Sequence, residues 1–277
     1  MNNARIAQYS PGRGLVSLAG LVALLTVLAL TSAVHSASGA KPTADKPTIV
    51  LVHGAWADSS GWSDVVRRLQ KRGYNVLAPA TPLRSLASDA AYLASFLAQT
   101  SGPIVLAGHS YGGAVITNAA AGNPNVKALV YVNGFAPDVG EDTLQLAGAD
   151  SLIPSSIEFK GIPPFGPNDV DVYIKKANFN ETFAGDLPEK LTDVLWATQR
   201  PVALAAGAGG TTATAWRTIP SWYLLARQDK TITPTAQRMM ATRAGSTIVE
   251  IDSAHLSMLS HPNAVVDLIE TAASVAG

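Results

Sequence analysis

Short apolar runs alternate along this chain with longer segments whose apolar residues follow helical spacing. The first run, Thr48–Val52, is rich in β-branched residues and has no polar interruption, which is typical of a strand buried on both faces. The same pattern predicts further strands at residues 74–78, 103–107, 126–132, 221–226 and 246–251.

Helical patterns separate these strands. Apolar positions on one helical face predict a helix over residues 86–97, and small apolar residues predict another over 112–121. Pro234 and Pro262 each begin a further helix, because proline is favoured in the first turn. This alternation implies an α/β domain over residues 41–277, with a mostly parallel sheet flanked by helices.

One stretch breaks the alternation. Residues 138–218 contain many prolines and glycines and no clear buried strand. We interpret this stretch as a cap inserted between two core strands, with helices expected at 170–177 and 187–197. No internal repeat is visible.

The N-terminus has a different pattern. Arg5 and Arg13 precede an apolar run at residues 15–30, which is followed by small residues at 36–40. This order predicts a signal peptide over residues 1–40, cleaved after Ala40 or after Ser36, and a secreted or periplasmic protein. The alternative is an uncleaved membrane anchor, because the run approaches the length of a membrane span.

Composition excludes several classes of protein. Apolar residues make up 47% of the chain, charged residues make up 14%, and the net charge is zero. A nucleic-acid binder would need a basic surface, and a disordered protein would need more charge and less apolarity. There is no cysteine, so disulfides and thiolate metal sites are excluded. Without HExxH or paired-histidine spacing, we expect neither a metal nor another cofactor.

The strongest chemical motif is Gly108-His-Ser-Tyr-Gly112, which fits the pattern G-x-S-x-G. The pattern alone is weak, but here it directly follows a buried strand and directly precedes a helix of small residues. That setting places a serine on a strained turn with its hydroxyl exposed to substrate. Ser110 is therefore the predicted nucleophile.

A serine nucleophile needs a base, and the chain has five histidines. His255 follows the strand at 246–251 in a loop, where a base is expected. His35 lies in the predicted signal segment, whereas His53 and His109 precede the part of the sheet that would carry a base. His261, next to Pro262, remains as an alternative, although a residue at this position is expected simply to lie on the surface.

The base in turn needs a carboxylate, and in this arrangement the chain order is serine, acid, histidine. Asp229 follows the strand at 221–226 and lies between Ser110 and His255. Asp138, which follows the strand ending near residue 132, is a rival for the same role. Asp252 is close to His255 in sequence but is expected to point away.

Two backbone N–H groups should bind the developing oxyanion. Tyr111, the residue after the nucleophile, should supply one. Ala55, in the loop after the first strand, should supply the other, and Gly54 before it permits close approach of the backbone. Trp56 either lines the substrate pocket or packs in the core.

Together these residues resemble the α/β-hydrolase superfamily, and in particular its branch of plant methyl-ester esterases and hydroxynitrile lyases. The resemblance covers about residues 47–277. It rests on His53-Gly54, the elbow at 108–112, Asp229-Lys230 and the run at 255–262. It implies the α/β-hydrolase fold and the triad Ser110, Asp229 and His255. Lyases of this branch carry threonine and lysine where this chain has Gly54 and Leu256, which weakens the lyase interpretation.

The predicted function is that of a serine hydrolase, a carboxylesterase acting through an acyl-enzyme on Ser110. The apolar cap favours small, uncharged, mostly apolar esters, although amides and lactones also fit. The alternatives are a hydroxynitrile lyase and a non-catalytic ligand-binding relative. The expected partner is a small-molecule ester, with no nucleic acid and, if the signal is cleaved, no stable membrane association.

Overall fold

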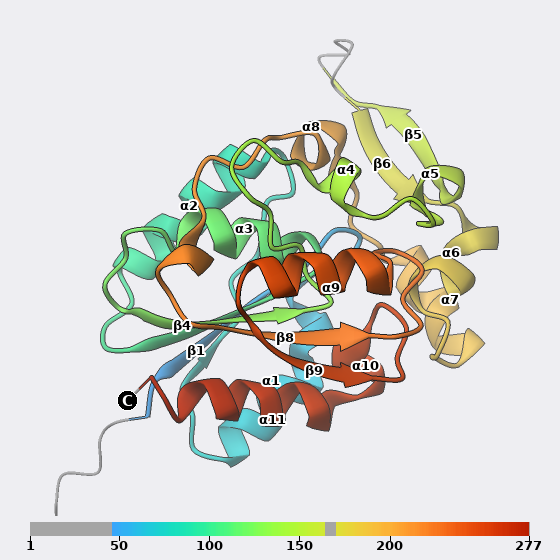
Figure 1. Ribbon diagram of the computed structural model, residues 1–277. Coiled ribbons are helices and arrows are strands. Elements are labelled where there is room, and N and C mark those ends of the chain that lie inside the picture. Colours follow the sequence, from blue (N-terminus) through green and yellow to red (C-terminus); the bar gives the residue numbers. More distant parts are fainter. Residues whose placement is uncertain (1–45, 164–169, 277) are drawn as a thin grey trace, which may run out of the picture. The chain divides into compact units, whose positions relative to one another are not determined.

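The computed structural model describes residues 46–163 and 170–276, which form a central sheet between helices and a smaller second sheet (Figure 1). The central sheet has strand order β2-β1-β3-β4-β8-β9, and all neighbouring strands are parallel. The strands are β1 (Thr48–Val52), β2 (Val76–Leu77), β3 (Ile104–His109), β4 (Val126–Val132), β8 (Ser221–Ala226) and β9 (Thr247–Ile251). The predicted α/β fold with a mostly parallel sheet is confirmed.

Three strands differ in length from the prediction, of which β9 lacks only the first predicted residue. β2 is shorter and pairs with β1 only at Val76 and Leu77. β3 is longer, because Gly108 and His109 still pair with Tyr131 and Val132 of β4. The sheet therefore continues up to the residue before Ser110.

Helices cover both faces of the central sheet (Figure 1). Val50 and Val52 of β1 pack in one apolar core, and Ile49 and Leu51 pack in the other. The first core contains residues of α2 (Leu86–Ala98), α3 (Tyr111–Ala119) and α9 (Pro234–Arg243), and the second contains residues of α1 (Ser63–Lys71) and α11 (Pro262–Ala273). Because successive side chains of a strand point to opposite faces, a sheet covered on both sides requires uninterrupted apolar strands.

The chain leaves the central sheet after β4 and returns to it at β8 (Figure 1). Between them lies an antiparallel sheet of β5 (Ile157–Gly161), β6 (Val170–Ile174) and β7 (Val202–Ala203). The segment also contains α4 (Thr143–Leu146), α5 (Ile153–Ser156), α6 (Lys176–Phe183), α7 (Glu189–Ala197), α8 (Leu204–Gly207) and η2 (Ala215–Arg217). This is the predicted cap inserted between two core strands.

The prediction of a helix at residues 170–177 is wrong. Val170–Ile174 forms β6, the central strand of the cap sheet, and the helix α6 begins only at Lys176. The β-branched residues of this segment suit a strand, and pairing with β5 and β7 supplies partners that the sequence does not reveal. Val172 and Ile174 are buried. The cap therefore contains a buried strand, although no clear one was expected there from the sequence.

The predicted signal segment, residues 1–40, lies outside the described residues. Among the residues that the structure describes, no helix is long and apolar enough to cross a membrane.

Candidate active site

Ser110 occupies a sharp turn between β3 and α3. Its φ of +53° is unusual for a residue with a side chain. The turn is fixed on both sides, because the Ser110 carbonyl accepts hydrogen bonds from the N–H groups of Gly113 (2.9 Å) and Phe135 (3.1 Å). Such strain persists only where the surrounding structure over-determines the backbone. The Ser110 side chain thus lies at the end of the sheet where β3 gives way to α3.

The glycines on either side of Ser110 allow elements to approach closely. A Cβ on Gly108 would lie 2.5 Å from the Gly112 carbonyl oxygen, and a Cβ on Gly112 would lie 2.5 Å from the Val52 oxygen of β1. Both contacts are with backbone, which has no room to move. The spacing of the motif is therefore a steric requirement of the strand–turn–helix unit.

Asp229 and His255 form a buried pair. The Nδ1 atom of His255 lies 2.7 Å from Oδ2 of Asp229, and both side chains are fully buried. Because a carboxylate only accepts hydrogen bonds, Nδ1 carries the proton and Nε2 is left as the basic atom. Within residues 46–163 and 170–276, Nε2 has no hydrogen-bond partner and no bond to Ser110 is formed.

The Asp229 carboxylate is held by three further donors. Its Oδ1 accepts from the N–H groups of Thr231 (2.8 Å) and Ile232 (3.0 Å), and its Oδ2 accepts from Nε2 of Gln237 (2.8 Å). Gln237 lies on α9. Sequence reasoning missed it, because a glutamine eight positions from the acid carries no local signal of this role.

His109, inside the elbow, connects Ser110 to the histidine loop. Its Nε2 donates to the His255 carbonyl oxygen (2.9 Å), and the two rings lie 4.7 Å apart between centroids. Burial lowers the pKa of His109 well below its ordinary value, so the ring stays neutral. The structure therefore brings His255 alongside the residue that precedes Ser110.

The two expected oxyanion donors line the same cavity as Ser110. Tyr111 is the first residue of α3, where backbone N–H groups have no partner within the helix. In the described part of the chain, neither the Tyr111 nor the Ala55 N–H has an acceptor. A Cβ on Gly54 would lie 2.7 Å from Ser110 Cβ, so the loop carrying Ala55 passes directly against the nucleophile.

The Tyr111 side chain has a buried partner that the sequence did not reveal. Its hydroxyl donates to Oδ2 of Asp89 on α2 (2.8 Å). Burial raises the pKa of Asp89, while this hydrogen bond opposes the rise. The bond fixes the Tyr111 ring, which lines the cavity.

Trp56 lines the cavity and also packs against the cap. Its Nε1 donates to the Val172 carbonyl oxygen of β6 (2.9 Å). Its ring meets the edge of Phe183 at 5.8 Å. Trp56 thus joins the loop after β1 to the cap.

The rival residues lie elsewhere. Asp138 pairs with Arg217 (2.6 Å) and Asp252 pairs with Arg227 (2.8 Å), and among the described residues neither carboxylate hydrogen-bonds to a histidine ring. His261 is 40% exposed, and its Nδ1 lies 2.9 Å from the Ser260 hydroxyl. His53 accepts from the Thr81 N–H through Nε2. Burial lowers the pKa of His53, so this ring also stays neutral.

A cavity of about 310 Å³ opens between Ser110 and the cap. Its walls come from the loop after β1, the elbow and every strand of the cap sheet, and the described residues that line it include no charged side chain. The lining residues are Ala55, Trp56, Ser110, Tyr111, Phe135, Thr143, Leu144, Ala147, Gly148, Ser151, Ile153, Pro154, Ile157, Phe159, Val172, Val202, Ala203, Leu204, Gly207 and Thr231.

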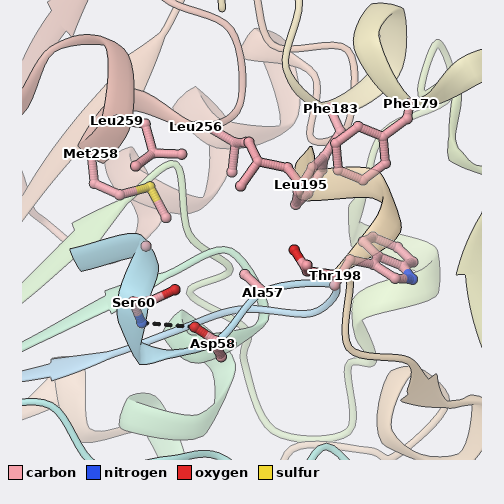
Figure 2. Close-up of a pocket in the computed structure, with 12 residues that line it drawn as sticks. Ala57, Asp58, Ser60, Phe179, Phe183, Leu195, Thr198, Leu256, Met258 and Leu259 are labelled. Atoms are coloured by element: carbon pink, nitrogen blue, oxygen red, sulfur yellow. Dashed lines mark hydrogen bonds between the residues drawn. The ribbon is translucent and has the colours of Figure 1, made fainter. Parts of the chain in front are cut away.

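A smaller pocket of about 40 Å³ lies beside Trp56. Figure 2 shows Phe183 and Leu256 on one side of this pocket and Asp58 and Ser60 on the other. In the residues that the structure describes, no group of three or more histidine, aspartate or glutamate side chains is arranged to hold a metal ion.

Residues 49–268 match the model of the alpha/beta hydrolase family. The chain belongs to this family. The resemblance inferred from the motifs is thereby confirmed. The alpha/beta hydrolase nvfD of Aspergillus novofumigatus is 28% identical over 264 residues, which cover 83% of this chain and 98% of the relative.

A further relative and a solved structure are similar over most of the chain. The pyrethroid hydrolase of Sphingobium wenxiniae is 26% identical over 244 residues, covering 80% of this chain and 85% of the relative. The crystal structure of tomato methylketone synthase I has a TM-score of 0.72 at 19% identity, covering 84% of this chain and 99% of that one. At that identity the structural likeness shows the fold alone.

Proposed function

We propose that this chain is a serine hydrolase that cleaves carboxylic esters through an acyl-enzyme on Ser110. The observation that carries the proposal is the elbow serine at φ +53° beside a buried Asp229–His255 pair whose Nε2 atom has no partner among the described residues. A strained serine next to an oriented base is the arrangement that activates a hydroxyl nucleophile.

The proposed reaction has two halves. As Ser110 Oγ attacks the ester carbonyl carbon, its proton passes to Nε2 of His255, and the carbonyl oxygen becomes an oxyanion bound by the N–H groups of Ala55 and Tyr111. Asp229 stabilises the imidazolium. The carbon–oxygen bond to the alcohol then breaks, and the alcohol leaves with the proton from Nε2.

Water completes the cycle. It attacks the acyl carbonyl while Nε2 of His255 takes its proton, and the same two N–H groups hold the second oxyanion. The bond to Ser110 Oγ breaks, Oγ recovers the proton, and the carboxylic acid departs. Each half uses the same base, so loss of His255 affects both.

The cavity supports an uncharged, mostly apolar ester. The hydroxyls of Thr143, Ser151 and Thr231 line it, yet each donates to a backbone carbonyl oxygen, at 3.1, 2.7 and 2.7 Å respectively. Trp56 Nε1 is likewise occupied by the Val172 carbonyl. A charged or strongly polar substrate group would lose its water there without gaining matched partners. The pyrethroid hydrolase among the relatives is consistent with this substrate class.

The lyase alternative is disfavoured at both positions that distinguish it. A threonine side chain at Gly54 would meet Ser110 Cβ at 2.7 Å. Leu256, directly after His255, is a buried apolar residue and offers no positive charge to a cyanide leaving group. Cyanide released from a cyanohydrin at a rate comparable to ester cleavage would restore this alternative.

Covalent labelling tests the proposal. A serine-directed organophosphonate should add once per chain, on Ser110, and abolish esterase activity. Ser110→Ala should lower kcat by roughly 10³- to 10⁶-fold, because the triad acts as a unit and only the oxyanion hole and binding remain. The melting temperature should hardly change. Labelling by mass spectrometry and activity on chromogenic esters provide the readouts.

Two further variants serve as controls for this test. His255→Ala should lose about as much rate as Ser110→Ala, whereas His261→Ala should lose little. Full esterase activity in Ser110→Ala, or labelling at another serine such as Ser257, would refute the mechanism. A non-catalytic ligand-binding protein would show neither turnover nor labelling.

We further propose that residues 1–40 direct export, on the basis of their basic start, apolar run and small residues. Mass spectrometry of the mature protein should find an N-terminus between about residues 35 and 41. Recovery of the protein with intact Met1 from a soluble cytoplasmic fraction would contradict export. Recovery with intact Met1 from membranes would indicate an uncleaved anchor.

A further inference from the structure

Asp186 of the cap contacts the loop that carries His255. It lies between α6 and α7, and its Oδ2 accepts hydrogen bonds from the Ala254 N–H (3.0 Å) and the Ser253 hydroxyl (2.9 Å). Ala254 directly precedes His255. The Asp186 side chain is only 15% exposed, so these hydrogen bonds are formed largely out of water.

Residues of the core hydrogen-bond to two backbone carbonyl groups of the same loop. Asn133, directly after β4, donates from Nδ2 to the Ala254 carbonyl oxygen (3.1 Å). His109, the last residue of β3, donates from Nε2 to the His255 carbonyl oxygen (2.9 Å). The core therefore fixes two carbonyl groups of the loop, and the cap fixes the Ala254 N–H through Asp186.

A second contact from the cap reaches the imidazole itself. The rings of Phe183 and His255 lie 5.1 Å apart between centroids, and Phe183 is the last residue of α6. Asp186 follows three residues later. One short stretch of the cap thus supplies both a packed ring and a carboxylate to the histidine loop.

The serines after His255 extend the Asp186 contact. The Ser257 hydroxyl donates to the Ser253 hydroxyl (2.9 Å), which donates to Asp186. The hydroxyls of Ser253 and Ser260 lie 3.1 Å apart. This series of hydrogen bonds leads from α10 (Ser257–Ser260) to the cap carboxylate. It involves serine hydroxyls that the catalytic triad does not use.

We propose that Asp186 is a positioning residue for His255, fixing the peptide that carries the base. The inference rests on the proposed function, in which His255 takes the proton of Ser110. A misplacement of about 1 Å in a catalytic group costs on the order of 100-fold in rate.

Other charged and titratable groups also face these residues. His255 is faced by Asp229 and by His109. Asp186 is faced by His261, whose Nδ1 lies 3.8 Å from Oδ2. Asp252, near His261, is already paired with Arg227. Asp186 is thus the only cap carboxylate among the described residues that hydrogen-bonds this loop.

Two substitutions test this positioning role. Asp186→Ala removes the acceptor and should lower kcat roughly 10- to 100-fold, with KM for a small chromogenic ester changed by less than about threefold. Asp186→Asn keeps a side-chain oxygen that can accept from the Ala254 N–H, and should lose less rate.

Asp193→Ala is the matched control. Asp193 is another cap aspartate, on α7, but it is 57% exposed, and among the described residues its ion pair is with Lys176 at the surface. Its kcat should equal that of the unmodified enzyme. Unchanged kcat in Asp186→Ala, or an equal loss in Asp186→Ala and Asp186→Asn, would overturn the inference, even if the melting temperature fell.

A readout independent of turnover separates this inference from the proposed function. The NMR signal of the His255 Nδ1 proton, shared with Asp229, should exchange faster with solvent in Asp186→Ala and stay unchanged in Asp193→Ala. Equal exchange in all three proteins would overturn the inference. Absence of esterase activity and of phosphonate labelling in the unmodified protein would instead refute the proposed function.

Discussion

At the scale of single residues, the Asp229 carboxylate is the most constrained group of the candidate site. It accepts hydrogen bonds from His255, Thr231, Ile232 and Gln237. Acceptance by both oxygens prevents rotation of the carboxylate. The carboxylate therefore determines which nitrogen of His255 carries the proton.

Asp229→Asn should keep the fold and lower kcat by roughly 10⁴-fold, because an amide favours the wrong tautomer of His255. Steady-state kinetics on a chromogenic ester would measure the loss, and circular dichroism would check the fold. Asp138→Asn is the control, since Asp138 pairs with Arg217 away from the histidine rings. A loss in Asp138→Asn without one in Asp229→Asn would transfer the acid role to Asp138.

At the scale of elements, the unit β3–Ser110–α3 packs against β1 and the loop after β4. The Gly112 position lies against the Val52 and His53 oxygens, and the Gly113 position lies against the Phe135 backbone. These contacts aim α3 and its N-terminal N–H groups at the cavity. A side chain at either position would push the helix away from the strand that it must adjoin.

Gly112→Ala should destabilise the protein by about 1–3 kcal/mol or more, because its Cβ would lie 2.5 Å from a backbone oxygen of a core strand. Urea unfolding followed by tryptophan fluorescence would measure the change. Gly61→Ala is matched to it, since that Cβ would meet only the flexible end of Met258 at 3.9 Å. Its unfolding free energy should change by less than about 0.5 kcal/mol. Equal effects of the two substitutions would contradict the steric argument.

At the scale of the whole molecule, two histidines are buried in neutral form between the core and its loops. Burial lowers the pKa of both His53 and His109. The unfolded chain takes up a proton at each of these residues below about pH 6.5, whereas the folded chain does so only at lower pH. Acidification therefore favours the unfolded state.

The unfolding free energy should accordingly be constant above about pH 6.5 and fall as the pH decreases below it, by up to about 1.4 kcal/mol per pH unit for each histidine. Urea titrations between about pH 7.5 and 5.5 would measure this slope. His261→Gln should keep the same slope, since both buried rings remain in place. A flat profile over this range would show that neither histidine contributes.

The predictions made from sequence succeeded where a local pattern suffices. Uninterrupted β-branched runs such as Thr48–Val52 identify buried strands, because in a sheet covered on both faces successive side chains are buried on either side. The elbow around Ser110 is recognisable because its glycines are steric requirements of a strand–turn–helix unit. By contrast, residues 170–174 became a strand only through pairing with β5 and β7, which no local periodicity encodes.

By itself, the sequence determined the strand order along the chain, the elbow and the order of Ser110, Asp229 and His255, since these depend on neighbouring residues and on chain direction. Only the tertiary structure decided which side chains support them. Gln237 reaches Asp229 from α9, and Asp186 reaches Ala254 from the cap, 68 positions away in sequence. Hydrogen bonds between segments depend on how the elements pack, and packing is a property of the folded chain as a whole.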